Sequence, residues 1–283
     1  MGRTVVVTGA NSGIGLVTAL ELAGAGFDVI GTARSQDKAD VLHMAAAERG
    51  LNLECLLLDV ADAESTEKGF AEIDALTGGG PWAVVNNAGL AQAGAIEDVD
   101  DEGVRYQLEV NLVAPARIAR LVLPGMRRRG DGRIVNISSI AGRLSLPLMG
   151  WYCASKHGLE AMTDALRMEV APYGVKVVLV EPGSFGTGIW EGARYPDDPS
   201  TEQYASAYDR ARRTTLTGTR VFPDPVWVAR TVRLALSTPR PLARYLVGVD
   251  AVSGVITERL VPTVVSDVVK GFVTGVRRLP FRR

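Results

Sequence analysis

Short apolar runs alternate with longer amphipathic segments along most of the chain. The apolar runs are rich in β-branched residues, which is typical of strands buried on both faces of a parallel sheet. Because runs of this kind recur at intervals that leave room for helices, the alternation predicts an α/β fold: a doubly wound parallel sheet of about seven strands with helices on both faces. The expected strands are Thr4–Val7, Asp28–Thr32, Leu53–Leu58, Ala83–Asn86, Arg133–Ser138, Lys176–Glu181 and Arg244–Val249, and the main expected helices are Asp101–Arg128 and Trp151–Tyr173.

Composition adds few constraints to this picture. The 283 residues contain 47% hydrophobic and 22% charged residues, with a net charge of −1, which gives no bulk attraction to nucleic acid or membrane. Two cysteines and two histidines show no metal-ligand spacing, so we expect no metal site. No run approaches the roughly 18 uncharged apolar residues of a membrane span. Since the first strand begins almost at Met1, we expect no secretory signal and a cytoplasmic location.

The first expected strand leads directly into a glycine-rich turn and then into a helix. The turn reads Thr8-Gly9-Ala10-Asn11-Ser12-Gly13-Ile14-Gly15. Glycines allow the backbone to approach a pyrophosphate closely, and the helix N-terminus attracts its charge. Strand, turn and helix in this order therefore predict a dinucleotide site, with a plain strand-to-helix turn as the alternative.

Tyr152 and Lys156 stand one helical turn apart and share one face of an expected helix. A phenol with an ordinary pKa of about 10 is a poor proton-transfer group at neutral pH. A nearby ammonium in a partly desolvated site can lower that pKa by about 3 units, or about 4 kcal/mol. Such a phenol could exchange a proton with a carbonyl or hydroxyl oxygen. The same spacing also arises as an ordinary contact on one face of a helix. The pair therefore indicates a catalytic role only in combination with the other motifs.

Five motifs together resemble the short-chain dehydrogenase/reductase family and stand in its order between residue 4 and about residue 187. They are Thr8-Gly-x-x-x-Gly-Ile-Gly15, Asn86-Asn87-Ala88-Gly89, Ile134-Val135-Asn136-Ile137-Ser138-Ser139, Tyr152-x-x-x-Lys156 and Pro182-Gly183. The resemblance implies a Rossmann-type fold and an NAD(P)-dependent enzyme acting on CH–OH groups. The segments around Tyr152, Glu181 and Arg244 look like the hydroxysteroid and retinol dehydrogenase branch.

The resemblance also implies a catalytic tetrad of Asn111, Ser139, Tyr152 and Lys156. Tyr152 would be the acid/base, and Lys156 would lower its pKa and bind the nicotinamide ribose. Ser138 competes with Ser139, whose interval of 13 residues to the tyrosine fits the family better. The serine hydroxyl would stabilise charge on the substrate oxygen. Asn111 would anchor a water in the proton path to Lys156.

Further residues are implied to contact the cofactor. They are Gly9, Asn11, Ser12, Gly13, Ile14, Gly15, Arg34, Asp59, Val60, Asn87, Ala88, Gly89, Tyr152, Lys156, Pro182, Gly183, Phe185 and Thr187. The second strand ends in Ala33-Arg34, where an NAD-preferring protein would carry an acidic residue. A guanidinium there suits a 2′-phosphate. We therefore expect NADP(H) as the preferred cofactor and NAD(H) as the alternative, unless Arg34 is only a solvated residue at a strand end.

The substrate side is expected to be apolar. The loop Leu144–Trp151 joins two catalytic candidates, and its side chains either border the substrate or pack beneath the loop. Residues 185–222 include Trp190, Tyr195, Tyr204 and Tyr208 and are interpreted as a substrate lid within one domain spanning residues 1–283. Apolar walls favour a lipophilic primary or secondary alcohol and its carbonyl.

Two other functions stay open. A ketoreductase of acyl-thioesters or small ketones would need basic docking residues, and Arg127-Arg128-Arg129 is the obvious basic cluster. A non-catalytic dinucleotide-sensing regulator usually lacks the tyrosine or lysine, whereas this chain has all four tetrad candidates.

The C-terminal region has an apolar stripe that predicts an amphipathic helix over residues 261–276. Its members are Val261, Val264, Val265, Val268, Val269, Phe272, Val273 and Val276, and four arginines follow between Arg277 and Arg283. The stripe either packs on the lid or a neighbouring subunit, or lies reversibly at a membrane surface. The family resemblance implies a homodimer or homotetramer formed by the helices near residues 101–128 and 151–173.

Overall fold

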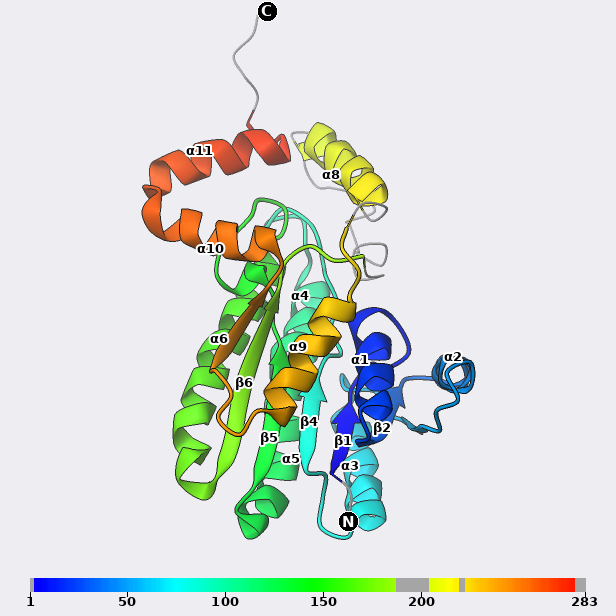
Figure 1. Ribbon diagram of the computed structural model, residues 1–283. Coiled ribbons are helices and arrows are strands. Elements are labelled where there is room, and N and C mark those ends of the chain that lie inside the picture. The colour runs from blue at the N-terminus through cyan, green and yellow to red at the C-terminus, as the bar shows by residue number, and fades with distance from the viewer. Residues whose placement is uncertain (1–2, 187–203, 219–221, 278–283) are drawn as a thin grey trace, which may run out of the picture.

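The computed structural model describes residues 3–186, 204–218 and 222–277, and of residues 214–218 only the backbone. Its centre is a seven-stranded parallel sheet in the order β3-β2-β1-β4-β5-β6-β7 (Figure 1). This confirms the predicted fold class, and each predicted strand is present with its ends moved by at most two residues. The strands are β1 (Thr4–Val7), β2 (Asp28–Ala33), β3 (Glu54–Leu57), β4 (Ala83–Asn86), β5 (Gly132–Ile137), β6 (Val175–Pro182) and β7 (Arg244–Val247).

Helices cover both faces of the sheet because successive strand residues point to opposite sides. In β1, Val5 and Val7 belong to one core cluster and Val6 to the other. The first cluster includes side chains of α1 (Gly13–Gly24), α2 (Gln36–Ala47) and α9 (Val226–Ser237). The second includes side chains of α3 (Ala63–Thr77), α5 (Ala114–Arg129) and α6 (Gly150–Val170). Such two-sided burial explains why the strands are apolar at nearly every position.

The strand order reverses direction at β1. The chain passes from β1 to β2 and β3 on one side, and β4 to β7 then extend the sheet on the other side. In a doubly wound sheet, the connections after the two central strands diverge at this point and leave a crevice at their carboxyl ends. This topology, and no single residue, determines where the candidate site lies.

Two of the predicted helices have different boundaries from those expected. The segment predicted as one helix over 101–128 is α4 (Asp101–Leu108), a π-helical turn over Glu109–Val113, and α5. The C-terminal helix predicted over 261–276 is shorter, since α11 is Thr263–Thr274.

One helix was not predicted at all. Gly248, with a φ of +108°, ends the strand that was expected to reach Val249, and α10 (Val249–Leu260) begins there instead. Together with α8 (Ala205–Gly218), the helices α10 and α11 lie beyond the carboxyl ends of the strands (Figure 1).

Candidate active site

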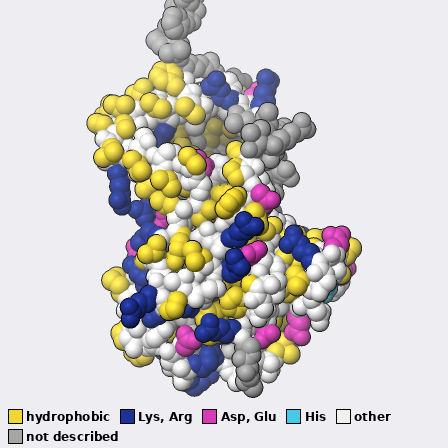
Figure 2. All heavy atoms as spheres, viewed as in Figure 1, with side chains coloured by type: hydrophobic (Ala, Val, Ile, Leu, Met, Phe, Trp, Pro, Cys, Tyr) yellow, Lys and Arg dark blue, Asp and Glu magenta, His cyan; other side chains and the backbone are white. Residues whose placement is uncertain are grey.

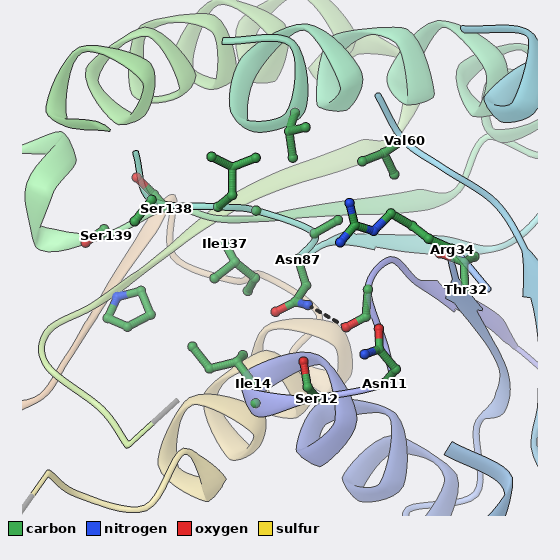
Figure 3. Close-up of a pocket in the computed structure, with 18 of the residues that line it drawn as sticks. Asn11, Ser12, Ile14, Thr32, Arg34, Val60, Asn87, Ile137, Ser138 and Ser139 are labelled. Carbon is green, nitrogen blue, oxygen red and sulfur yellow. Dashed lines mark hydrogen bonds between the residues drawn. The ribbon is translucent and has the colours of Figure 1, made fainter. Parts of the chain in front are cut away.

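A cleft runs along the carboxyl edge of the sheet across the reversal point. Figure 3 shows the glycine turn with Asn11, Ser12 and Ile14 on one side and Ile137, Ser138 and Ser139 on the other. The cleft brings together all the residues predicted to bind cofactor that the structure describes, except Gly15, which lies just behind its wall. The predicted residues that line it are Gly9, Asn11, Ser12, Gly13, Ile14, Arg34, Asp59, Val60, Asn87, Ala88, Gly89, Tyr152, Lys156, Pro182, Gly183 and Phe185. Thr187 lies outside the described residues.

Close backbone packing shapes the glycine turn. A Cβ atom on Gly15 would lie 2.2 Å from the carbonyl oxygen of Gly9, and Gly9 itself has a φ of +65°. Any larger residue at position 15 would therefore displace the turn. The Asn87 side-chain amide donates to the carbonyl oxygens of Thr8 (2.9 Å) and Gly9 (3.2 Å), and a dashed line in Figure 3 marks a hydrogen bond of Asn87. These contacts join the turn after β1 to the end of β4.

The N-terminus of α1 is available to an anion. Ser12 precedes the helix in an extended conformation, its side chain makes no capping hydrogen bond, and the first turn of α1 contains no acidic residue. The first N–H groups of a helix have no partner within the helix, and together with the helix dipole they favour negative charge. The glycine cradle and this helix end fit the pyrophosphate of a dinucleotide.

Cationic side chains border the adenosine end of the cleft. Arg34 and Lys38 both line it, and Arg34 Nη1 donates to the Tyr106 hydroxyl over 3.0 Å. On the opposite wall, the Asp59 carboxylate accepts from the backbone N–H of Ala61, which fixes the turn after β3. A free phosphate group at this end would meet two cations, whereas a ribose hydroxyl would find no acidic side chain at the end of β2.

Tyr152 lies at the other end, buried within α6 at 3% exposure. Burial raises the pKa of its phenol to about 12, while a hydrogen bond with Ser139 lowers it in part. Burial therefore opposes the lowering of this pKa by Lys156 that the sequence led us to expect. The phenol of the described structure is protonated throughout the neutral range.

Lys156 is also buried, which lowers the pKa of its amine to about 8 against the raising effect of Glu160. Its Nζ donates to the backbone carbonyl of Ile137 over 2.9 Å and lies 5.9 Å from the centroid of the Tyr152 ring. The amine is therefore directed by the end of β5 toward the cleft.

Asn111 sits in the π-helical turn between α4 and α5. Its side chain donates to the Leu90 carbonyl (2.9 Å) and to Ser155 Oγ (3.0 Å), and accepts from the Leu90 N–H (3.0 Å). A Cβ atom on Gly89 would lie 3.3 Å from its Oδ1 and 3.8 Å from Lys156 Nζ. The extra residue of a π turn rotates one side chain out of helical register, and such turns are frequent at functional sites.

The two serines after β5 point in different directions. Ser139 hydrogen-bonds with Tyr152, and its Oγ also accepts from the Ala141 N–H over 3.1 Å. Ser138 Oγ instead lies near the space above Gly142 that Glu160 also borders, and it has no hydrogen-bond partner. The hydrogen bond with Tyr152 therefore favours Ser139 over Ser138, which is the same choice that the interval of 13 residues favoured in the sequence.

A buried cluster of charged side chains lies beneath the site. Glu181 at the end of β6 and Glu160 on α6 hydrogen-bond to each other, and Arg244 Nε lies 3.1 Å from Glu181 and 3.2 Å from Glu160. Arg143 lies 3.5 Å from Glu181. Burial, and then the neighbouring Glu160 carboxylate, raise the pKa of Glu181 to about 7, although both arginines lower it. The cluster joins the helix that carries Tyr152 to the strand that ends at Pro182.

The end of the cleft that is predicted to hold the nicotinamide is lined by Pro182, Gly183 and Phe185. Asp250 on α10 accepts from the Ser184 N–H over 2.6 Å, and a Cβ atom on Gly183 would lie 2.1 Å from the same carboxylate. The first turn of α10 therefore fixes the position of this wall.

Two leucines of the apolar loop before Tyr152 pack against helices at this end of the molecule. Leu144 packs close to Gly254 of α10, and Leu148 packs with Ala207 and Tyr208 of α8. The Tyr208 hydroxyl is also occupied, because it bonds with Asp98 (2.6 Å) and the Ala95 N–H (2.7 Å). The alternative interpretation, that these leucines pack beneath the loop, fits the structure. Much of the predicted lid, including Trp190 and Tyr195, lies outside the described residues.

Sequence reasoning missed two residues of the adenosine end. Lys38 follows Arg34 by four positions, and that spacing of two cations could have indicated it. Tyr106 is 72 residues from Arg34 and reaches it only through the fold. Within the described ranges, no group of three or more His, Cys, Asp and Glu residues could hold a metal ion, and no helix has the length and apolarity of a membrane span.

Comparisons with known proteins agree with this geometry. A family model described as short chain dehydrogenase matches residues 3–197. Retinol dehydrogenase 16 of Mus musculus is 33% identical over 265 residues, which cover 88% of this chain and 81% of that protein.

Two solved structures are also similar. A short-chain dehydrogenase from Streptomyces avermitilis has a TM-score of 0.82 and 35% identity, covering 97% of both chains. A metagenomic short-chain oxidoreductase in complex with NADP has a TM-score of 0.70 and 26% identity, covering 87% of this chain and 96% of that one.

The Glu160–Glu181 pair predicts a pH-dependent stability. A carboxyl whose native pKa of about 7 exceeds its ordinary 4.5 binds its proton more tightly in the native state. The free energy of unfolding should therefore fall as pH rises from about 4.5 to about 7. Glu181→Gln should flatten that fall by up to about 1.4 kcal/mol per pH unit, measured by urea unfolding. Glu67→Gln on the exposed face of α3 is the control; equal slopes for both variants would contradict the assignment.

Proposed function

Because this chain belongs to the short-chain dehydrogenase family and is thus an oxidoreductase acting on CH–OH groups, we propose that it interconverts a lipophilic alcohol and its carbonyl with NADP(H). The observation that carries the proposal is the continuous cleft from Arg34 to Tyr152, which has an anion-binding helix end between them. A bound nicotinamide dinucleotide would supply hydride exchange with the substrate carbon.

Tyr152 is proposed as the proton donor. Its raised pKa keeps the phenol protonated at neutral pH, so the side chain can give a proton to a carbonyl oxygen. Ser139, which already bonds with Tyr152, would hydrogen-bond the same substrate oxygen and stabilise its developing charge. These two groups favour the reduction of a carbonyl, in which an oxygen must gain a proton.

Lys156 and Asn111 are proposed to supply and position the proton path. The Lys156 amine, with a pKa of about 8, can exchange a proton near neutral pH. Asn111 is held by both backbone groups of Leu90 and lies near Lys156 across Gly89, so it could orient a water between solvent and the amine. Lys156 would also bind the nicotinamide ribose.

The cofactor preference rests on Arg34 and Lys38. Both line the adenosine end of the cleft. The similar metagenomic short-chain oxidoreductase has NADP bound, which supports the same cofactor class. A 2′-phosphate would form charge-assisted bonds with these cations, whereas NAD(H) would leave them without an anionic partner.

A lipophilic substrate is supported by the similarity to retinol dehydrogenase 16 and by the apolar surfaces of the helices beside the nicotinamide end. Turnover of NADPH against steroid, retinoid, aliphatic and acyl-thioester carbonyls would test the substrate class directly. A preference for the acyl-thioesters would instead assign the protein to the ketoreductase function, and binding of cofactor without any turnover would assign it to regulation.

We further propose that the protein forms a homodimer or homotetramer through α5 and α6. Apolar side chains are exposed along this part of the surface, including Leu121 (36%), Met168 (67%) and Tyr173 (51%). Burying them between copies would remove apolar area from water. A cytoplasmic location remains part of the proposal.

Replacing the phenol should stop turnover without preventing cofactor binding. Tyr152→Phe removes the proton donor and little volume, so we expect kcat to fall at least about 100-fold. The Kd for NADPH, measured by fluorescence titration, should stay within about twofold. Tyr173→Phe at an exposed position serves as the control. A Tyr152→Phe variant that retained a tenth of the wild-type kcat would refute the proposed mechanism.

The two serines form a matched pair of tests. Ser139→Ala should lower kcat by about 10²–10³-fold, because the substrate oxygen loses one hydrogen-bond donor. Ser138→Ala removes a buried hydroxyl that has no partner, so kcat should stay within about threefold. Steady-state kinetics on the best substrate would decide. If Ser138→Ala were the more damaging change, the assignment to Ser139 would be wrong.

Cofactor selectivity should depend on Arg34. A charge-assisted contact contributes about 1.5–3 kcal/mol, so Arg34→Ala should raise the KM for NADPH by about tenfold to a hundredfold. The KM for NADH should change by less than about threefold. Arg120→Ala on the exposed face of α5 is the control. Equal effects of Arg34→Ala on both cofactors would make Arg34 a solvated surface residue.

A further inference from the structure

The helices α10 and α11 expose an unusual number of apolar side chains. On each helix these residues recur at three- and four-residue steps and so share one face. The same region is coloured as a hydrophobic area in Figure 2, over the two helices at the end of the molecule. The nine residues, here called the valine face, are Val249, Val252, Ile256, Leu260, Val264, Val265, Val269, Val273 and Val276, with exposures from 38% to 87%.

Three polar residues of this region point inward. The Glu258 carboxylate accepts from Lys270 Nζ over 2.7 Å and from Ser266 Oγ over 3.2 Å, and Ser266 is only 7% exposed. This small network joins α10 to α11. The Glu258 carboxylate also neutralises Lys270, the one cation of α11, on the side of the helix that faces the protein. An ordinary surface helix buries its apolar face and exposes its polar one. Here many apolar side chains of both helices are exposed, while Ser266 and Lys270 face inward.

The valine face is attached firmly to the body of the protein. Ala251 and Val255 on the opposite side of α10 are buried, and a Cβ atom on Gly254 would lie 2.5 Å from the Ile140 side chain. At its first turn, α10 holds Ser184 through Asp250. Anything bound to the valine face would therefore lie directly beside the nicotinamide end of the cleft.

Cationic residues surround the valine face. Arg259 and Arg277 are exposed at the ends of α10 and α11, and the adjacent α8 exposes Arg210, Arg212 and Arg213. The described residues of this region, 204–218 and 249–277, contain six basic and four acidic residues, a charge of +2 in a chain whose total is −1. An excess of positive charge thus lies at the end of the molecule where these apolar side chains are exposed.

We propose that the valine face docks on the surface of a lipid bilayer that contains anionic lipids. An apolar face bordered by arginines is the pattern of helices that lie in the membrane interface, with apolar side chains among the acyl chains and cations at the headgroups. A second copy of the chain fits less well, because a two-fold contact through this face would bring two positively charged rims together. Docking places the cleft where a lipophilic substrate partitions, but it does not require the proposed reaction.

Co-sedimentation of the full-length protein with vesicles tests the proposal. The wild type should sediment with phosphatidylcholine vesicles that contain phosphatidylserine, and much less with phosphatidylcholine alone. Rising salt should release it, because the arginines contribute through screened charge. Val265→Glu/Val269→Glu should weaken the partition coefficient at least about tenfold. Leu76→Glu/Leu234→Glu, which changes exposed apolar residues on α3 and α9, should leave it unchanged.

Thermal unfolding and sedimentation velocity distinguish a loss of docking from misfolding and from self-association. Should the double variant on α11 fail to fold, Val249→Glu, at the most exposed position of the face, replaces it. The proposal is overturned if wild-type protein stays in the supernatant with both vesicles at low salt. It is also overturned if it binds both vesicle types equally, or if folded valine-face variants bind like the wild type. A wild-type dimer that the variants dissociate, without vesicle binding, would show that a second copy covers the face.

Discussion

The hydrogen bonds that Thr8 and Asn87 form between the ends of β1 and β4 hold the rest of the site in place. The Thr8 hydroxyl accepts from the backbone N–H groups of Asn87 and Ala88, both over 3.0 Å, while the Asn87 amide donates back to the turn. In a doubly wound sheet, the connections after these two strands diverge and leave the crevice between them. Together with the pairing of β1 and β4 in the sheet, this link therefore fixes the glycine cradle relative to the wall that leads to Gly89 and Lys156.

The same burial that forms the cleft sets its proton chemistry. Both Tyr152 and Lys156 belong to α6, and removing both from water shifts their pKa values toward their neutral forms: the phenol upward and the amine downward. A hydrogen bond with Ser139 opposes this effect for the phenol, and the charge of Glu160 opposes it for the amine. A proton donor and a near-neutral amine thus arise from one environment, with no need for the lysine to contact the phenol.

Sequence patterns predicted the fold and most of the cleft because local rules determine both. Apolar runs of strand length specify buried strands, and the glycine turn must follow β1 whatever surrounds it. The π turn at Asn111 and the contact between Arg34 and Tyr106 depend on packing between distant segments, which no local pattern encodes. The raising effect of burial on the pKa of Tyr152 was missed for a related reason: the spacing to Lys156 is visible in the sequence, but the depth of burial is not. The strand β7 ends at Val247, two residues before its predicted end, because Gly248 has a positive φ and α10 begins at Val249.

The apolar stripe of the C-terminal helix shows what the spacing of apolar residues cannot predict. A repeat of three and four residues establishes that one face of α11 is apolar, but it contains no information on which way that face points. The direction follows from a pairing across the bend between the helices, where Glu258 on α10 is placed to accept from both Ser266 and Lys270. Satisfying a half-buried carboxylate and its ammonium on the inner side is favourable enough to orient the helix, since unpaired charges there would be costly. The valines are then left at the surface, which is the arrangement that the proposed docking on a lipid bilayer would use.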